Sequence, residues 1–287
     1  METTLSSKTK TVVIGPDRPF VIIGERINPT GRKKLAEEMA AGDFSRLRAD
    51  AVAQEGAGAQ VLDVNAGVPG ADEAALMAQA VAAVLEAVDA PLCFDSASPA
   101  ALEAALSLYQ GKALINSTTG EDARLARVLP LARKYGAAVI CLCSDERGPS
   151  PDPLVRLEVA RKIAGRAADY GIPPADLLMD PLVMTVGVDS VAAKVTLETM
   201  GLLRRELGVN LVAGASNVSF GLPDRPALNA TFLSMAMAMG LGAAIANPLE
   251  PSVRIAVLAG DLLLGHDEYA MRWIRDFRKR SAAKGMA

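Results

Sequence analysis

The sequence predicts an α/β protein folded as a single closed (β/α)8 barrel of the TIM-barrel type. Short apolar runs of strand length alternate with helical segments eight times along the chain, and this alternation requires a parallel sheet. No linker rich in Gly, Ser or Pro divides the chain, and its 287 residues suit eight such units. A doubly wound open sheet is the alternative, but Gly24-Glu25-Arg26 is not the G-x-G-x-x-G pattern that it would carry after its first strand.

The predicted strands are apolar runs that end in a polar residue or a glycine, as is typical of parallel strands covered on both faces. The clearest are Leu92-Cys93-Phe94, which leads into Asp95, and Leu114-Ile115, which leads into Asn116. In chain order the predicted strands cover residues 20–24, 59–62, 91–94, 113–115, 137–143, 177–179, 211–214 and 242–246.

The segments between the strands have the period of amphipathic helices. In 71–88, for example, apolar residues recur at four-residue spacing from Leu76 to Val88 and form one apolar face. A glycine, Gly171, follows the helix that ends at Tyr170 and is suited to a C-cap. The predicted helices cover residues 35–39, 45–55, 71–88, 100–108, 121–135, 154–170, 188–207, 225–239 and 251–264, with an amphipathic terminal helix over 268–279.

We therefore divide the chain into a polar N-terminal lead, residues 1–19, to which the sequence assigns no role, and one barrel domain, residues 20–287. The chain has no uncharged apolar run of about eighteen residues and no apolar signal core after Met1. A cytoplasmic protein is expected.

Composition narrows the partners. With 30 Lys and Arg scattered among 33 Asp and Glu, the net charge of −3 argues against nucleic acid and favours a small ligand or a protein. Cys93, Cys141 and Cys143 lie in apolar runs without C-x-x-C spacing, which predicts core packing. With His266 as the one histidine, a His-rich metal site or a Ser-His-Asp triad is hard to assemble, and no metal is expected.

Carboxylates and amides gather at the predicted strand ends. The set is Glu25, Asn28, Asp63, Asn65, Asp95, Asn116, Asp180, Asn217 and Ser219. These ends meet at the C-terminal mouth of a barrel, where such folds hold their active sites, although single members could instead cap the following helices. A ring without Lys or His is a poor phosphate or metal site and suits a flat heterocycle that presents N–H donors on one edge.

The chain resembles the pterin-binding methyltransferases that move a methyl group between methyltetrahydrofolate and a corrinoid protein. The resemblance runs from about Val21 to Leu264 and rests on Gly24-Glu25-Arg26-Ile27-Asn28, Leu62-Asp63-Val64-Asn65, Phe94-Asp95-Ser96, Ile115-Asn116-Ser117, Asp180-Pro181-Leu182 and Ser216-Asn217-Val218-Ser219. That family includes the acetogen corrinoid iron–sulfur protein methyltransferase, and the chain is also similar to the folate domain of cobalamin-dependent methionine synthase. The resemblance implies a pterin-binding barrel like that of dihydropteroate synthase.

By this resemblance, Asn217 contacts N5, the pterin nitrogen that carries the methyl group, and is the catalytic residue. The residues implied to bind pterin or folate are Asp95, Asn116, Asp180, Asn217, Ser219 and Arg225. Those implied to support them or to face the corrinoid are Glu25, Asn28, Asp63 and Asn65. Phe220 stands where the acetogen enzyme has Gln. Methyltetrahydrofolate or tetrahydrofolate is the implied substrate, the corrinoid (cobalamin) comes from a partner protein, and a homodimer is implied.

N5 must gain a proton or a stronger hydrogen bond as the methyl group leaves. Because the ring lacks histidine, Asn217 is expected to stabilise this charge change with a proton derived from solvent. Two alternatives are a dihydropteroate synthase and a folate-binding subunit without chemistry. The first is disfavoured because its family needs a lysine and a Ser-Arg pair near the late strands, where this chain has Ser216-Asn217-Val218-Ser219. The direction of methyl transfer is left open.

Overall fold

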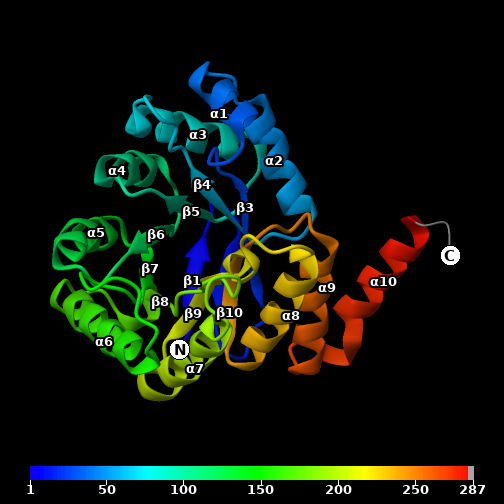
Figure 1. Cartoon of the computed structure of the whole chain (residues 1–287). Coiled ribbons are helices and arrows are strands. Elements are labelled where there is room, and N and C mark those ends of the chain that lie inside the picture. The colour runs from blue at the N-terminus through cyan, green and yellow to red at the C-terminus, as the bar shows by residue number, and fades with distance from the viewer. Residues whose placement is uncertain (284–287) are drawn as a thin grey trace.

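A computed structural model describes residues 1–283 of the chain. Its centre is a closed barrel of eight parallel strands in the order β10-β3-β4-β5-β6-β7-β8-β9 (Figure 1). The strands are β3 (Val21–Ile27), β4 (Val61–Asn65), β5 (Leu92–Asp95), β6 (Leu114–Thr118), β7 (Ala138–Leu142), β8 (Leu177–Asp180), β9 (Asn210–Gly214) and β10 (Leu241–Ala246). The predicted (β/α)8 barrel is confirmed, and the open doubly wound sheet is excluded by the closure between β10 and β3.

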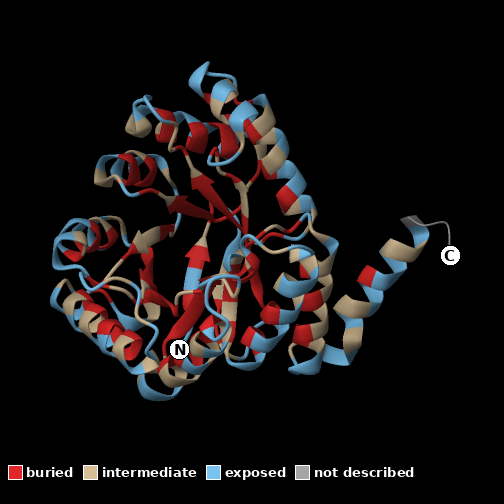
Figure 2. Cartoon of the chain, viewed as in Figure 1, coloured by how far each residue is buried: buried red, intermediate tan, exposed pale blue. Residues whose placement is uncertain are grey.

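Helices surround the barrel, and those up to residue 263 bury their apolar faces against it (Figure 2). They are α1 (Lys33–Ala40), α2 (Ser45–Gly56), α3 (Glu73–Ala87), α4 (Pro99–Leu108), α5 (Asp122–Tyr135), α6 (Pro153–Asp169), α7 (Ala192–Leu207), α8 (Arg225–Ala238), α9 (Pro251–Leu263) and α10 (Met271–Ala283). Helix starts follow local chemistry: Asp72 accepts the N–H groups of Ala74 and Ala75 as the N-cap of α3. None of the helices within residues 1–283 has the length and apolar character needed to cross a bilayer.

The barrel interior is apolar near the N-terminal ends of the strands and polar near their C-terminal ends. The apolar residues include Ile23, Val61, Cys93, Leu114 and Leu178, which are fully buried in one cluster. Side chains of a strand alternate between its two faces, so the residue two positions later points the same way. Two positions further along these strands are Glu25, Asp63, Asp95, Asn116 and Asp180. The period of the strands therefore directs these polar side chains inward at the C-terminal mouth.

The first residues form a feature that the sequence analysis did not predict. Two short antiparallel strands, β1 (Thr3–Ser6) and β2 (Thr11–Ile14), make a hairpin, and β1 is drawn within the ring of strands in Figure 1. Leu5 and Ile14 are fully buried in the same cluster as the barrel interior, and Asn210 Nδ2 donates to the carbonyl oxygen of Ile14 at 3.1 Å. The lead thus packs against the apolar, N-terminal end of the barrel.

Three short 3₁₀ helices complete the described chain: η1 (Pro174–Asp176), η2 (Ala215–Ser219) and η3 (Glu268–Ala270). Helix η2 follows β9 directly and therefore lies at the C-terminal mouth. Helix α10 extends away from the barrel beyond α9 (Figure 1). The three cysteines are buried and unpaired, which confirms their predicted role in core packing.

Candidate active site

Strand register sets three of the predicted site residues side by side. Asn65 on β4 pairs with Asp95 on β5, and Asp95 pairs with Asn116 on β6. Asp180 ends β8, where its neighbour in the register is Leu142 on β7. Acids and amides that are far apart in the sequence therefore meet at one end of the barrel.

Two hydrogen bonds fix how these groups face the mouth. Asn65 Nδ2 donates to Asp95 Oδ2 at 3.0 Å, and Asn116 Nδ2 donates to Asp63 Oδ1 at 3.2 Å. Among the described residues, none donates a hydrogen bond to Asp95 Oδ1 or to the amide oxygen of Asn116. An amide whose N–H group is engaged presents its oxygen on the other side. This part of the mouth therefore offers two neighbouring acceptors to a ligand with N–H donors.

Burial raises the pKa of the acids in this region. The pKa of Asp63 is raised to about 8 by burial and by the neighbouring Asp95 carboxylate, so Asp63 is largely protonated at neutral pH. Burial also raises the pKa of Asp95, against the hydrogen bond from Asn65. Because Asp63 carries the proton, Asp95 has no ionised carboxylate from Asp63 beside it, and an ionised Asp95 would accept charge-assisted hydrogen bonds.

Asp180 is held by its own loop. Its Oδ1 accepts the backbone N–H of Leu182 at 2.8 Å, and Leu182 adopts a left-handed backbone conformation with φ 66°. Burial raises the pKa of Asp180 to about 6, opposed by the Leu182 N–H and by the nearby Arg156 guanidinium. At neutral pH Asp180 is therefore mostly ionised, though less completely than an exposed aspartate.

Two buried or half-buried arginines pin the loops that follow these strands. Arg156 on α6 is 2% exposed and donates to the carbonyl oxygens of Pro181 and Leu182 at 2.6 and 2.9 Å. Arg124 on α5 donates to the carbonyl oxygen of Ser117 at 2.9 Å, in the loop after Asn116. The sequence analysis missed both residues, because their partners are backbone carbonyls and leave no side-chain pattern to read.

Asn217 lies across the mouth from Asp95 and Asn116. It belongs to η2, directly after β9, and in the closed strand order β9 and β10 lie on the opposite side of the ring from β5 and β6. Asn217 lines a cavity of about 430 Å³ together with Glu25, Arg26 and Arg225. A Cβ at Gly214 would lie 3.1 Å from Asn217 Nδ2. The glycine at the end of β9 thus allows the Asn217 amide to lie close against the backbone.

Arg225 and Ser219 form a connected group on the same side. Arg225, the first residue of α8, donates through Nε to Ser219 Oγ at 3.1 Å and through Nη2 to the carbonyl oxygen of Ser216 at 2.9 Å. Ser219 is fully buried and donates to Asn229 Oδ1 at 2.6 Å. The Arg225 guanidinium also lies 5.8 Å from the centre of the Phe220 ring, and Phe220 is 68% exposed. Ser219 therefore orients Arg225 at the cavity beside an exposed aromatic ring.

The structure holds Asn28 in its own loop, and it adds a site residue that was not predicted. Asn28 Oδ1 accepts the backbone N–H of Thr30 at 2.8 Å. Of the predicted site residues, Glu25, Asn217 and Arg225 line the cavity. Asn247 lines it as well. It follows β10 directly, so the strand-end pattern that found the other amides would have found it as well.

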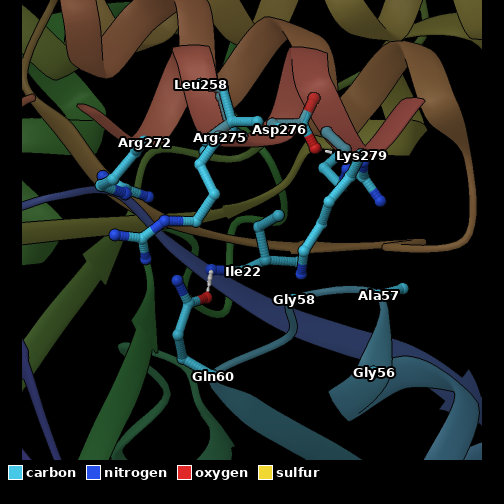
Figure 3. A pocket seen from close by; sticks show the side chains of 12 residues that line it. Ile22, Gly56, Ala57, Gly58, Gln60, Leu258, Arg272, Arg275, Asp276 and Lys279 are labelled. Atoms are coloured by element: carbon cyan, nitrogen blue, oxygen red, sulfur yellow. Dashed lines mark hydrogen bonds and ion pairs between the residues drawn. The ribbon is translucent and has the colours of Figure 1, made fainter. Parts of the chain in front are cut away.

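A second cavity, of about 260 Å³, lies away from this mouth. Figure 3 shows Arg272, Arg275 and Lys279 of α10 on one side and the Gly58–Gln60 region before β4 on the other. The cavity also contacts Ile22, near the start of β3. Because it adjoins the start of β3 and the segment that leads into β4, it cannot receive a ligand held by the acids and amides at the strand ends. Within residues 1–283, no group of three or more His, Cys, Asp or Glu side chains is arranged to hold a metal ion.

The profile of one family, described as "Pterin binding enzyme", matches residues 24–247, which contain the whole strand-end ring. The chain belongs to the pterin binding enzymes. This confirms the predicted family resemblance and the prediction of an enzyme.

Individual relatives refine the similarity. The pterin binding enzyme described here is 29% identical over 266 residues to the methylcorrinoid:tetrahydrofolate methyltransferase of Eubacterium limosum, covering 91% of this chain and 97% of that protein. It is 30% identical over 269 residues to the methionine synthase of Mycobacterium tuberculosis, covering 88% of this chain but only 23% of the synthase. The chain thus matches the first relative along nearly its whole length and the second over about a quarter.

Solved structures agree on the fold. The dihydropteroate synthase of Vibrio fischeri matches with a TM-score of 0.69 at 17% identity, covering 92% of this chain and 98% of that one. That of Xanthomonas albilineans matches with a TM-score of 0.64 at 19% identity, covering 88% and 95%. At these identities the likeness concerns the barrel alone.

Proposed function

We propose that the protein transfers a methyl group between N5 of methyltetrahydrofolate, or tetrahydrofolate, and the cobalt of a corrinoid carried by a separate protein. The single observation that carries the proposal is that two different kinds of polar group face each other across the mouth of the barrel. Free acceptor oxygens of Asp95 and Asn116, which form an acceptor wall, lie on one side, and Asn217 lies on the other. A folate head is flat and has different chemistry on its two edges, which suits such a site.

The acceptor wall fits the amino-pyrimidinone edge of a pterin. That edge carries an amino group and a ring N–H, both donors, and its hydrogen bonds to a carboxylate are of the strong, charge-assisted kind. Asp180, mostly ionised at neutral pH, adds a further acceptor on β8. With the edge bound there, the opposite side of the head, which includes N5, faces Asn217.

Asn217 has the chemistry that methyl transfer needs at N5. Its amide offers an N–H donor and a carbonyl acceptor, so it can bind the N5 lone pair before protonation and the N5–H group after it. A donor preorganised in this way acts where charge develops in the transition state and needs no rearrangement during the step. Asn217 is therefore the catalytic residue of the proposed mechanism.

Methyl transfer in particular is favoured by the relatives. The E. limosum protein named above, which this chain matches along 97% of that protein's length, carries methylcorrinoid and tetrahydrofolate in its name. The proposal assigns the corrinoid to a partner protein that would approach the same mouth.

The decisive experiment is a methyl-transfer assay with free cobalamin, run in both directions. Methyltetrahydrofolate with cob(I)alamin should give methylcobalamin, and methylcobalamin with tetrahydrofolate should give methyltetrahydrofolate. Absence of transfer in both directions, with the folate shown to bind by calorimetry, would leave a folate-binding subunit instead. Condensation of a pterin diphosphate with p-aminobenzoate would indicate a dihydropteroate synthase, for which the segment Ser216–Ser219 lacks the lysine and the Ser-Arg pair.

A further inference from the structure

The carboxyl group of Glu25 is hydrogen-bonded to the segment that carries Asn217. Glu25 lies on β3 two positions after Ile23, a residue of the barrel interior, and it lines the same cavity as Asn217. Its Oε2 accepts a hydrogen bond from Ser216 Oγ at 3.4 Å, and Ser216 immediately precedes Asn217 in η2. The sequence analysis placed Glu25 among supporting residues, but this contact places it beside the catalytic amide.

The proposed reaction, on which this inference rests, needs a proton that Asn217 cannot supply. An amide does not release a proton near neutral pH, whereas N5 without a proton would have to leave as an anion. In the balanced step, a carboxylic acid transfers its proton to N5. The pair of electrons on cob(I)alamin then forms the cobalt–carbon bond, and the carbon–N5 bond breaks to leave N5–H and a carboxylate.

We propose that Glu25 is this acid in the direction away from methyltetrahydrofolate, and the base that takes the proton from N5 in the reverse direction. The role requires a carboxyl group that reaches the cavity, lies next to Asn217 and can be protonated when the folate binds. Glu25 meets the first two requirements by its position on β3 and its contact with Ser216.

The surroundings of Glu25 meet the third requirement. Burial raises the pKa of Glu25, while the hydrogen bond from Ser216 and the charges of Arg26 and Arg225 oppose this rise. Asp63 on β4 also faces it, since ionised Glu25 contributes to the raised pKa of Asp63. A desolvated carboxyl with cations nearby can hold a proton and still release it within the catalytic cycle.

Two other carboxyl groups near the site are less suited to this role. Asp63 is largely protonated at neutral pH, but it is only 3% exposed, does not line the cavity and is bonded to Asn116. Glu250 borders the cavity from the start of α9, but its carboxylate accepts from Ser252 Oγ at 3.3 Å and does not contact η2. Glu250→Gln is therefore a matched control for Glu25→Gln.

The test compares two methyl donors. Methyltetrahydrofolate needs a proton at N5, whereas an N5,N5-dimethyl derivative is already a cation and leaves as a neutral tertiary amine. With cob(I)alamin, Glu25→Gln should transfer methyl from methyltetrahydrofolate roughly a hundredfold to ten-thousandfold more slowly than wild type, the usual range for loss of general acid catalysis. It should transfer methyl from the dimethyl donor at close to the wild-type rate.

The pH profile gives a second readout. In wild type and Glu250→Gln, transfer from methyltetrahydrofolate should fall as pH rises through the pKa of Glu25, and the reverse reaction should fall as pH drops. Both limbs should vanish in Glu25→Gln. Ser216→Ala should move both limbs to higher pH, because it removes a hydrogen bond that lowers this pKa. This second variant keeps the test valid if Glu25→Gln folds poorly, which folate calorimetry would reveal.

The outcomes separate the inference from the proposed function. A Glu25→Gln enzyme that uses methyltetrahydrofolate at the wild-type rate, or that loses both donors equally while binding folate, overturns the role of Glu25 and leaves methyl transfer in place. Pterin or folate binding without methyl transfer by the wild-type protein from either donor overturns the proposed function and this inference together.

Discussion

Asn116 donates its side-chain amide to Asp63 over 3.2 Å, and this bond turns the amide oxygen of Asn116 away from β4. The acceptor of the bond is largely protonated at neutral pH, because burial and Asp95 raise the pKa of Asp63 to about 8. A protonated acid thus orients the amide of Asn116 next to the carboxyl group of Asp95, and the three side chains act as a unit on neighbouring strands.

This unit predicts a pH-dependent stability. Asp63 binds its proton up to about pH 8 in the folded chain but only below its ordinary pKa of 3.8 when unfolded, so the stability it contributes is lost as pH rises between these values. Asp63→Asn removes the titration and keeps an acceptor for Asn116. The free energy of unfolding, measured with denaturant, should therefore fall more steeply with pH in the wild type than in Asp63→Asn. Between pH 4 and pH 8 we expect the variant to become more stable relative to the wild type by a few kcal/mol. A difference between the two proteins that is constant over this range would refute the protonation of Asp63.

The acceptor wall predicts a loss of binding. Asp95→Ala and Asp180→Ala each remove a carboxylate that would bind the pterin edge, a contact worth about 1.5–3 kcal/mol. Calorimetry with methyltetrahydrofolate should show affinities weaker by roughly tenfold or more. Asp169→Ala, at the exposed end of α6, is the control and should bind normally. If both site variants also bind normally, the edge assignment is wrong.

Asn217→Ala should affect turnover more than affinity. The loss of one preorganised donor costs about 2.7–4 kcal/mol in the transition state, so we expect turnover to fall roughly a hundredfold to a thousandfold with a modest change in folate affinity. Gly214→Ala should reproduce part of this loss, because its Cβ would lie 3.1 Å from Asn217 Nδ2. The rate of single-turnover methyl transfer to cob(I)alamin can be measured for both variants. A wild-type rate in Asn217→Ala would remove Asn217 from the mechanism.

Arg156 should stabilise the loop after Asp180. Arg156→Met leaves the carbonyl oxygens of Pro181 and Leu182 without their buried donor, and each unsatisfied group costs about 1–3 kcal/mol. We expect a lower free energy of unfolding and weaker folate binding. Arg161→Met, on the same helix with an exposed side chain, controls for the loss of a surface charge. Folate affinity equal to wild type would show that the loop keeps its shape without Arg156.

The N-terminal hairpin should contribute to the stability of the barrel. Leu5→Ala and Ile14→Ala each empty a fully buried position of the inner cluster, and such truncations cost about 2–5 kcal/mol. Thr4→Ala, on the exposed face of β1, should stay within about 0.5 kcal/mol of wild type. Equilibrium unfolding in denaturant distinguishes them. Equal effects at Thr4 and Leu5 would mean that the hairpin does not pack as described.

The barrel could be predicted from the sequence because its strands are apolar runs that end in a polar residue or a glycine. For the helical stretch over 188–207 the sequence left a start one turn later open, and α7 does begin there, at Ala192. Asp189 accepts the N–H of Val191 and holds a turn first. The hairpin escaped prediction because β1 has one apolar residue, Leu5, in a lead that is mostly polar, so no apolar run marks the strand.

The site was predicted in part. Strand ends identified Asp95, Asn116 and Asp180, since a carboxylate or amide after an apolar run is visible in the sequence. The pairing of Asn116 with Asp63 was not visible, because it depends on the stagger between β4 and β6, which only the closed barrel fixes. The same applies to Ser216 and Glu25, which are separated by 191 residues.

Leu5 and Ile14 lie at the N-terminal end of the barrel, and this limits how a ligand can enter or leave the site. Together with the packed side chains of the barrel interior, they close that end. Under the proposed function, a folate whose head rests among the strand ends would therefore enter and leave through the C-terminal mouth. The corrinoid would have to approach through the same mouth while the folate is still bound. Because the N-terminal end of the barrel is closed, the folate and the corrinoid of the proposed reaction would have to meet at the C-terminal mouth.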